Sequence, residues 1–529
     1  MKRIYKITQV ALFGAFIVGC TDLDTAPLSS TITADQKEDV VAADPSKIEA
    51  SVTAITANFT QYAKIYTEDD NVHSDIGYPT IMLATDSRTT DFVADITGYN
   101  WYSNSADYSD CLSTSTATIE FWGTLYNQIY TANAVIGTVD NETSDPTLQF
   151  YLAQALAIRA FDYFTLVQLY QFNYKGHEDA PGVPIITSEN AEEVAANGCA
   201  RSTVKETYEF ILGDLNKAIE LLANTKKTRS DKRYVSLDVA YGIRARVHLT
   251  MHNYADALKD AEAALASTSS VPYSSAAVSK PTFIDIEDAS WMWGILITDK
   301  DRVSTTGICN FPSHMGSLNY GYASVGGWRR ISPNLYNQIP ESDVRKGWFL
   351  DDTGVSVNLP AAAQAYITKK GAPVYTQVKY GPMNDEWGSN NNATDVILMR
   401  VEEMYLIKAE AQAMNNDVSG GVNTLNSFVN TYRDPSYKCT ATTGEAVQEA
   451  VWHQRRIEFW GEGLAYFDIM RLNKGVNRLG CGFPKTAVFN IVAGDPVQIY
   501  SIPNKEVQYN PLLENNPLVS APTPIPDEE

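Results

Sequence analysis

Residues 454–471 read QRRIEFWGEGLAYFDIMR, which is the most specific pattern in the chain. The charges in this stretch recur at spacings that allow pairing along one helix and its exit, and bridging to neighbouring helices. The residues concerned are Arg455, Arg456, Glu458, Glu462, Asp468 and Arg471. We expect them to form a charge network that stabilises the fold. A catalytic role for these residues is the less favoured interpretation.

Helical periodicity precedes this stretch. Residues 116–137 place apolar side chains at steps of three and four, which predicts the single apolar stripe of an amphipathic helix. Residues 147–170 are nearly all apolar, so we expect a helix that is buried on most sides. Inside that helix, Arg159 and Asp162 each need a buried partner.

Three further helical stretches are expected between about 203 and 267, with a break at His252-Asn253. Small residues occur where two antiparallel helices must approach closely, and Tyr241 and Tyr254 supply bulk around them. The small residues are Ala245, Ala257, Ala261 and Ala264. This spacing resembles a tetratricopeptide repeat, in which a helix pair hides its apolar face by stacking on neighbouring pairs.

A second, weaker helix pair is predicted at 397–414 and 418–432, where Gly420-Gly421 stands at positions that the repeat fills with helix formers. A last long helix is expected through about 445–473. Residues 268–395 differ, since they are rich in Gly, Ser, Pro, Asn and aromatic residues, and we interpret them as irregular loops and small hairpins. An irregular segment of this length usually carries function.

The sequence therefore predicts a mainly α fold: a tetratricopeptide-like helix-pair scaffold with a large irregular loop-rich insertion and a few short strands. We expect one domain over residues 46–529, in which about 46–267 and 396–529 form the helical scaffold and about 268–395 form the irregular ligand-binding region.

Taken in order, these segments resemble the SusD/RagB family of outer-membrane nutrient-binding lipoproteins. The stretch at 454–471 is similar to the family pattern E-R-R-x-E-L-x-x-E-G-x-R-x-x-D-L-x-R, with departures at Gln454 and Ala465 that remove one expected ion pair. The other matching pieces are AIRAFDYF at 157–164 with Leu169-Tyr170, the Gly-Val-Pro at 182–184, Arg400 with Tyr405-Leu406 and Ala409-Glu410-Ala411, and Ile502-Pro503 with Glu506, Asn510 and Asn515-Asn516.

The N-terminus has the layout of an export signal: basic residues, a short apolar run from Val10 to Val18, and Gly19 before Cys20. Ile17-Val18-Gly19-Cys20 resembles the bacterial lipobox, in which the cysteine is acylated and becomes the first residue of the mature protein. An ordinary signal peptide with a chance cysteine is the alternative. We therefore expect a lipoprotein signal peptide at 1–19 and a lipid-anchored, flexible polar tether at 20–45.

Composition excludes several classes of function. The net charge of −22 and the pI near 4.7 argue against nucleic acid and anionic membrane as partners, because both would repel this surface. We find no GxSxG, HExxH, P-loop or strand-linked GxGxxG motif, and the six histidines lack metal-ligand spacing. The five cysteines after Cys20 form no CxxC pair. We predict no catalytic residue, no metal and no cofactor.

The family resemblance implies a protein at the cell surface that is anchored in the outer membrane by lipid. It would capture oligosaccharide and deliver it to a SusC-like TonB-dependent transporter. Three alternatives stay open: a peptide-binding lipoprotein of the same fold, as in the RagB branch, an outer-membrane glycoside hydrolase, and a structural assembly lipoprotein.

Two loops have the chemistry of a sugar site, since sugars need flat aromatic platforms beside polar groups. One runs from Asp86-Ser87-Arg88 to the stretch YNWYSN at 99–104, and the other, NYGY at 319–322 through GGWR at 326–329, contains glycines that would let the backbone approach a ligand closely. We predict Trp101 and Trp328 as stacking platforms. The full set of predicted ligand contacts is Asp86, Arg88, Trp101, Tyr102, Asn104, Tyr320, Tyr322 and Trp328.

Overall fold

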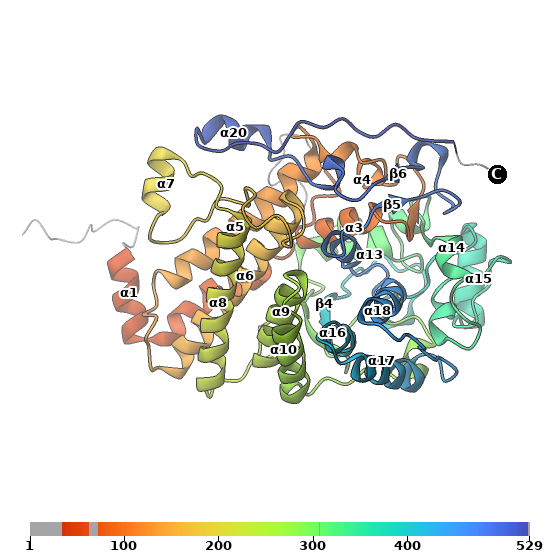
Figure 1. Ribbon diagram of the computed structural model, residues 1–529, viewed down its shortest axis with the longest axis horizontal. Helices are drawn as coiled ribbons and strands as arrows, with labels where there is room; N and C mark the ends of the chain where they lie inside the picture. The colour runs from red at the N-terminus through yellow and green to blue at the C-terminus, as the bar shows by residue number, and fades with distance from the viewer. Residues whose placement is uncertain (1–33, 63–71, 306, 527–529) are drawn as a thin grey trace, which may run out of the picture.

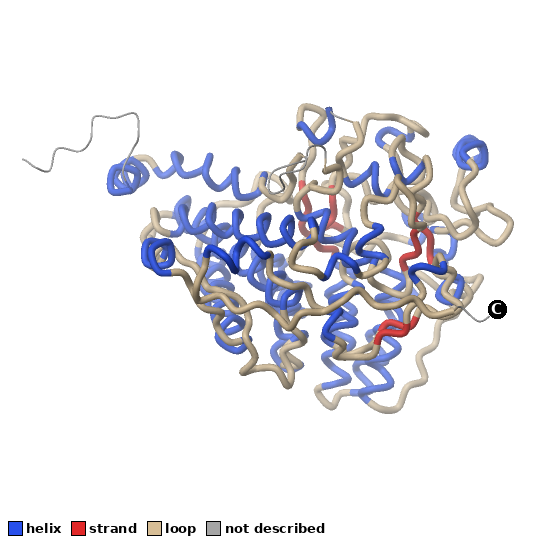
Figure 2. Tube along the Cα trace, turned by 90° about the horizontal axis from the view of Figure 1, so that it is seen from above, coloured by secondary structure: helices blue, strands red, loops and turns tan. Residues whose placement is uncertain are grey.

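The computed structural model describes residues 34–62, 72–305 and 307–526, in which helices dominate and the few short strands lie among loops (Figures 1 and 2). The main helices are α5 (Thr116–Ile136), α6 (Pro146–Tyr170), α8 (Val204–Asn224), α9 (Leu237–Thr250), α10 (Tyr254–Ser267), α16 (Val401–Met414), α17 (Val418–Tyr432) and α18 (Gly444–Glu458). This confirms the predicted mainly α fold.

These helices stack in the order in which they occur in the chain. α5 packs on α6, α6 on α8, α8 on α9 and α9 on α10. α10 then packs directly on α16, which contacts both α17 and α18. The loop-rich residues 268–395 therefore leave the stack after α10, and the stack resumes at α16 as though they were absent, which is the arrangement expected of an insertion into a helical repeat.

Small residues set the close helix contacts, as predicted. Ala257, Ala261 and Ala264 are fully buried on α10. In the second pair, a Cβ on Gly421 would lie 2.7 Å from the carbonyl oxygen of Ala409, so α17 approaches the backbone of α16 more closely than any larger residue allows. Gly421 thus costs helix propensity but permits the packing that the pair needs.

The structure corrects three of the predicted elements. Residues 397–400 belong to strand β4 (Val396–Arg400) and are not helical. The last helix is broken into α18 and α19 (Ala465–Arg471), because Gly461 and Gly463 take left-handed backbone angles with φ of 79° and 72°. The strands of the insertion form no local hairpins: β2 (Trp291–Ile295) pairs with β4, and β3 (Arg329–Ile331) pairs with β1 (Phe92–Ala94), which lies far earlier in the chain.

Short elements complete the described part of the chain. They are α1 (Ala34–Ala43), η1 (Pro45–Ile48), α2 (Glu49–Ala57), α3 (Tyr78–Ser87), α4 (Ser103–Ala106), η2 (Ser109–Cys111), α7 (Ala191–Asn197), α11 (Ser275–Val278), α12 (Arg302–Thr305), α13 (Phe311–Met315), η3 (Tyr322–Ser324), α14 (Pro333–Tyr336), η4 (Val344–Trp348), α15 (Ala361–Lys370), η5 (Met383–Asp385), β5 (Val476–Asn477), η6 (Lys485–Ala487), β6 (Asn490–Ile491), η7 (Pro496–Gln498) and α20 (Asn504–Tyr509).

The predicted signal peptide and Cys20 lie outside the described residues. α1 begins at Ala34, so a helix occupies the end of the segment predicted as a flexible tether. Within the three described ranges, every helix is too short or too polar to traverse a bilayer.

A buried charge network centres on Glu458, the last residue of α18. One carboxylate oxygen accepts from Arg400 at 2.9 Å and from Arg433 at 2.8 Å, and the other accepts from Arg433 at 2.7 Å and from Arg345 at 3.1 Å. All four side chains are fully buried. Burial alone raises the pKa of a carboxyl group, but here Arg433 and Arg400 hold the pKa of Glu458 well below its usual value.

The rest of the 454–471 stretch extends this network, as predicted. Glu462 bonds Arg400 and Lys379, at 2.8 and 2.6 Å. Asp468 is held between Arg455 and Arg471. At the position where the family pattern has glutamate, Gln454 accepts a hydrogen bond of 2.5 Å from Arg345, so the expected ion pair is replaced by a bond to a neutral amide.

Of the two charged residues of α6 that were predicted to need buried partners, one has a partner and the other does not. Arg159 forms a double hydrogen bond with Asp214, at 2.7 and 2.8 Å, which confirms the prediction. Asp162 is fully buried, and neither carboxylate oxygen has a hydrogen-bond partner among the described residues, so the prediction was wrong for it. Burial raises its pKa well above the usual value, and Asp162 is therefore accommodated as a neutral acid.

Replacing Glu458 tests the central network. Glu458→Gln should lower the free energy of unfolding by about 3–5 kcal/mol, because it leaves buried guanidinium groups without an anion. Denaturant unfolding measures the change. Since the folded-state pKa lies below 4.5, the effect should be constant above that pH and should shrink only as the pH falls below it.

Glu449→Gln is the matched control, because Glu449 pairs with Lys474 at an exposed site of α18. Its cost should stay below about 1 kcal/mol. Equal costs for the two variants would contradict a central role for Glu458.

Asp162→Asn tests the neutral buried acid. A raised folded-state pKa means that Asp162 favours folding fully only below its ordinary pKa of 3.8, and that this contribution is lost as the pH rises toward the folded-state pKa. The Asn variant should therefore be at least about 1 kcal/mol more stable than the parent at neutral pH, with no advantage at pH 3. A destabilised variant at neutral pH would show that an ionised Asp162 has a partner.

Candidate functional site

The candidate site is built by the pairing of β1 with β3. The two strands are antiparallel, with Ala94 opposite Arg329, so the loop that leaves β1 and the loop that enters β3 emerge at the same end of this small sheet. These are the two loops that the sequence singled out, and the structure brings them together although more than two hundred residues separate them.

Four aromatic side chains from these loops form what we call the aromatic surface: Tyr99, Trp101, Tyr320 and Tyr322. Tyr99, Trp101 and Tyr320 are exposed by 51, 37 and 47 %, which is uncommon for rings of this size. Tyr322 is half-buried, and its ring centroid lies 6.2 Å from that of Trp101, edge to face.

Two histidines support this surface from beneath. The ring of His73 stacks on Trp101 at 4.8 Å and shares a hydrogen bond with the hydroxyl of Tyr322. Below it, His314 stacks on Tyr322 at 5.0 Å, and its Nε2–H donates to the carbonyl of His73 at 2.9 Å. Trp101 and Tyr322 therefore rest on a second layer of rings, which is the preorganisation that a stacking site needs.

The two histidines of this second layer are uncharged. Burial, reinforced by the nearby Arg329, lowers the pKa of His314 to about 3, and burial also lowers the pKa of His73. Burial raises the pKa of Tyr322, so that its hydroxyl keeps its proton at physiological pH. An uncharged, preformed aromatic layer suits a neutral ligand with apolar faces.

A buried arginine fixes both loops. Arg329 donates to the side-chain oxygen of Asn100 at 2.8 Å and to the carbonyl of His314 at 2.9 Å. Arg330 adds a 2.7 Å ion pair to Asp95. These bonds join the loop of residues 95–104 to the strand that follows the second loop, so the aromatic surface does not depend on loop stiffness alone.

The glycines of the second loop serve this packing. A Cβ on Gly326 would lie 2.8 Å from the ring of Tyr99, and a Cβ on Gly327 would lie 2.8 Å from the Tyr99 carbonyl oxygen. The prediction that these glycines admit a ligand to the backbone was therefore wrong: they admit Tyr99.

Four of the predicted ligand contacts are buried and therefore do not belong to the site. Asp86 accepts from the backbone N–H of Gly463 at 3.0 Å, and burial raises its pKa to about 7. Arg88 is fully buried and bonds Asp110 at 2.9 Å. Tyr102 is 2 % exposed and Trp328 is 6 % exposed, and the latter fills a small apolar cluster beneath its loop.

The predicted contacts that reach solvent are Trp101, Asn104, Tyr320 and, in part, Tyr322. Sequence reasoning missed His73, because a lone histidine outside any ligand spacing carries no signal. Tyr99 was not among the predicted contacts although it lies in the first predicted loop, because the exposed fraction of a tyrosine is not visible in a sequence. A cavity of about 500 Å³ is lined by Tyr62, Arg302 and other residues, and Tyr62 is near enough to Tyr322 to affect its pKa.

No set of three or more His, Cys, Asp or Glu side chains within the three described ranges is placed to hold a metal ion. The site is thus defined by exposed rings and hydrogen-bonding side chains.

Comparisons with known proteins agree with this architecture. A family model described as starch-binding and associating with the outer membrane matches residues 35–249, and a model described as the SusD family matches residues 351–518. SusD-like protein P2 from Formosa agariphila is 25% identical over 392 residues, which are 67% of this chain and 72% of the relative. SusD-like protein P38 from the same organism is 22% identical over 68% of this chain and 73% of its own.

Solved structures share the fold. A SusD-like carbohydrate-binding protein from Bacteroides vulgatus superposes with a TM-score of 0.72 at 23% identity, covering 88% of this chain and 96% of that one. A SusD superfamily protein from Bacteroides thetaiotaomicron has a TM-score of 0.72 at 22% identity and covers 92% and 100%.

The fold and the site together define a helical-repeat scaffold protein that presents an aromatic surface on an irregular insertion. Within that class, the chain belongs to the SusD family, whose members usually bind carbohydrate and associate with the outer membrane.

The neutral second layer can be checked by NMR of the histidine ring nitrogens. The His314 ring should keep its Nε2–H tautomer from pH 8 down to about pH 4, because its pKa is about 3. His314→Gln assigns the resonances by their disappearance. A His314 titration near the ordinary value of 6.5 would contradict the buried, stacked geometry.

Proposed function

We propose that this protein captures oligosaccharides on the aromatic surface at the outside of the cell. The observation that carries the proposal is that two distant loops bring exposed aromatic rings to one surface, where Trp101 stacks on His73 and Tyr322 stacks on His314. Sugar rings present apolar C–H faces that stack on aromatic side chains, and Asn104 and the hydroxyls of Tyr320 and Tyr322 would bond the sugar hydroxyls.

The ligand would be extended. The cavity of about 500 Å³ beside Tyr62 lies in reach of the aromatic surface and offers Gln61, Arg302 and Thr60 as hydrogen-bonding groups. A chain of several sugars stacked on Trp101 could place its next residues there.

The proposal also includes the partner and the location. A lipid on Cys20 would hold the protein at the outer membrane, and a SusC-like TonB-dependent transporter would receive the captured oligosaccharide. The family description, which places starch-binding members at the outer membrane, supports this. Binding would be non-catalytic, and release of reducing ends from a bound oligosaccharide during long incubation would instead favour a hydrolase.

Removing the exposed rings should weaken binding. Against an array of oligosaccharides and peptides, Trp101→Ala should reduce affinity about tenfold for the sugars that the parent binds, and Tyr320→Ala somewhat less, since each stacking contact is worth about 0.5–1.5 kcal/mol. Calorimetric titration of the purified domain measures the change.

Tyr130→Ala is the control, because Tyr130 is exposed by 72 % on α5 and lies outside the aromatic surface. Unchanged sugar affinity in both Trp101→Ala and Tyr320→Ala would overturn the proposed site. If the protein bound peptides and no sugars, the peptide-binding alternative would replace the proposal of sugar binding at this site.

A further inference from the structure

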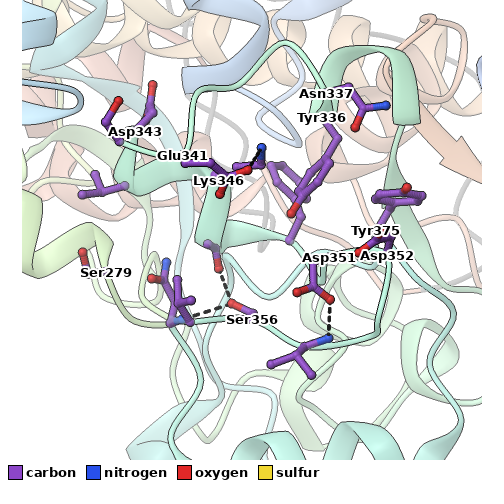
Figure 3. Close-up of a pocket in the computed structure, with 17 residues that line it drawn as sticks. Ser279, Tyr336, Asn337, Glu341, Asp343, Lys346, Asp351, Asp352, Ser356 and Tyr375 are labelled. Carbon is purple, nitrogen blue, oxygen red and sulfur yellow. Dashed lines mark hydrogen bonds and ion pairs between the residues drawn. The ribbon is translucent and has the colours of Figure 1, made fainter. Parts of the chain in front are cut away.

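A second pocket, distinct from the aromatic surface, opens at the other end of β3. The aromatic surface lies where the chain enters β3, whereas this pocket is formed by the residues that follow it, from α14 and η4, together with the turn at 351–358 and Tyr375. Its volume is about 460 Å³, within the roughly 300–1,000 Å³ of small-molecule sites. Figure 3 shows the side chains that line it.

Two tyrosines form one wall of this pocket. The rings of Tyr336 and Tyr375 lie 5.1 Å apart at an angle of 57°, and Figure 3 shows them above Asp351, with Ser279 and Ser356 on the opposite side. They meet at an angle, so they form an apolar corner and do not stack flat on one another. Such a corner can receive the face of a ring-shaped ligand.

The position of Tyr375 is held against its own backbone preference. Its φ of 65° lies in the left-handed region, which costs a residue with a side chain on the order of 1 kcal/mol. The backbone is held there by bonds of 3.0 Å from Tyr375 N–H to the carbonyl of Leu350 and from Ile331 N–H to the carbonyl of Tyr375. A glycine would adopt this conformation freely, so a tyrosine here points to a use for its ring.

Carboxylates, which are hydrogen-bond acceptors, lie across the pocket from the two tyrosine rings. Asp351 accepts three hydrogen bonds, from Thr353 N–H, Thr353 hydroxyl and Val355 N–H, and all three go to Oδ1. Oδ2 takes part in none of them. Asp352 and Glu341 add two more exposed carboxylates on the rim.

The floor of the pocket is rigid because it belongs to the central charge network. Asp343 lines the pocket and bonds Arg345 at 2.6 Å, and Arg345 in turn bonds Glu458. Ser356 donates to the carbonyl of Gly347 at 2.6 Å and so ties the turn to η4.

The charges of the lining side chains limit the kind of ligand that the pocket can bind. Of the described residues that line the pocket, Lys346 is the one cation, and Glu341 holds it at 2.6 Å, so Asp351 and Asp352 have no cation partner within that set. An anionic ligand would be repelled. Burial and the neighbouring Asp351 and Glu341 raise the pKa of Tyr336 to about 12, which keeps its hydroxyl a donor. The carboxylates are too dispersed to form a metal site among the described residues.

We propose that this pocket is a second sugar-binding site, which takes a neutral or amino-bearing sugar between the Tyr336–Tyr375 corner and the carboxylates of Asp351 and Asp352. The apolar face of the sugar packs on the rings, and its hydroxyl or amino hydrogens donate to Asp351 Oδ2 and Asp352. The site is independent of the aromatic surface and does not require the proposed function of that surface.

Fluorine NMR on the whole chain labelled with 3-fluorotyrosine tests the proposal, with Tyr336→Phe and Tyr375→Phe to assign the two signals. The probes are maltose, cellobiose, the glucosamine disaccharide, digalacturonate and a lysine-rich peptide. At least one neutral or amino disaccharide should shift the Tyr336 or Tyr375 signal saturably at about millimolar concentration, and digalacturonate should not.

Variants separate this site from the first one. The shift should survive Trp101→Ala and weaken about threefold or more in Asp352→Asn, and the shift of the Tyr336 signal should vanish in Tyr375→Gly. Asp352 is exposed, so Asp352→Asn should keep the unfolding midpoint of the parent. Tyr375→Gly loses the packing of a half-buried ring, and glycine's freedom in the left-handed region offsets part of that loss, so its midpoint is measured alongside to show that the variant is folded.

Three results would overturn the proposal. The first is no shift of either signal with any of the neutral and amino disaccharides up to about 20 mM. The second is loss of the shift in Trp101→Ala, which would assign it to the aromatic surface. The third is a shift produced only by a lysine-rich peptide, which would make the pocket a contact for a basic protein partner. If the Trp101 experiments showed no sugar binding while the Tyr375 signal still shifted, only the aromatic surface would be ruled out as a sugar site.

Discussion

The structure depends on the burial of Glu458 among three arginines. A carboxylate removed from water costs several kcal/mol unless its charge and lone pairs are satisfied, and here Arg345, Arg400 and Arg433 satisfy them from three different elements. Arg400 ends β4, Arg433 follows α17 and Arg345 lies in η4. The network therefore fixes where the helix stack meets the loop-rich insertion, and no alternative packing could leave any one of these charges unpaired without a large penalty.

The same helix end also positions the aromatic surface. Arg456 bonds Asp91 at 2.6 Å, and the indole N–H of Trp460 donates to the Asp91 carbonyl at 2.9 Å. The N–H of Ser332 donates to that carbonyl as well, at 3.0 Å. Asp91 precedes β1 and Ser332 follows β3, so the motif holds both strands at the end opposite the aromatic loops. The rings that would meet a ligand are thus carried by a sheet whose far end is tied to the charge network.

This division fits the finding that solved structures at 22–23 % identity share the fold. The frame is specified by buried charges and by small residues such as Gly421, whose replacement would separate α16 from α17. The exposed rings of Tyr99, Trp101 and Tyr320 make few demands on the core, so ligand preference can change without loss of the fold. Both proposed sites use β3, one at each end, and both rest on side chains that the frame has already fixed.

The sequence by itself determined the helices, the insertion and the charge motif, because helical periodicity and charge spacing are local properties. α5, α6 and α17 match their predicted ranges closely for this reason. It also drew attention to the two loops of the site. It could not place single residues within them: Arg88 and Trp101 look equally suited to bind a ligand, yet Arg88 is buried against Asp110 and Tyr500, and Trp101 is exposed over His73. Tertiary structure alone decided this, because the exposure of a side chain depends on which distant segment packs against it, and β1 meets β3 only in the folded chain.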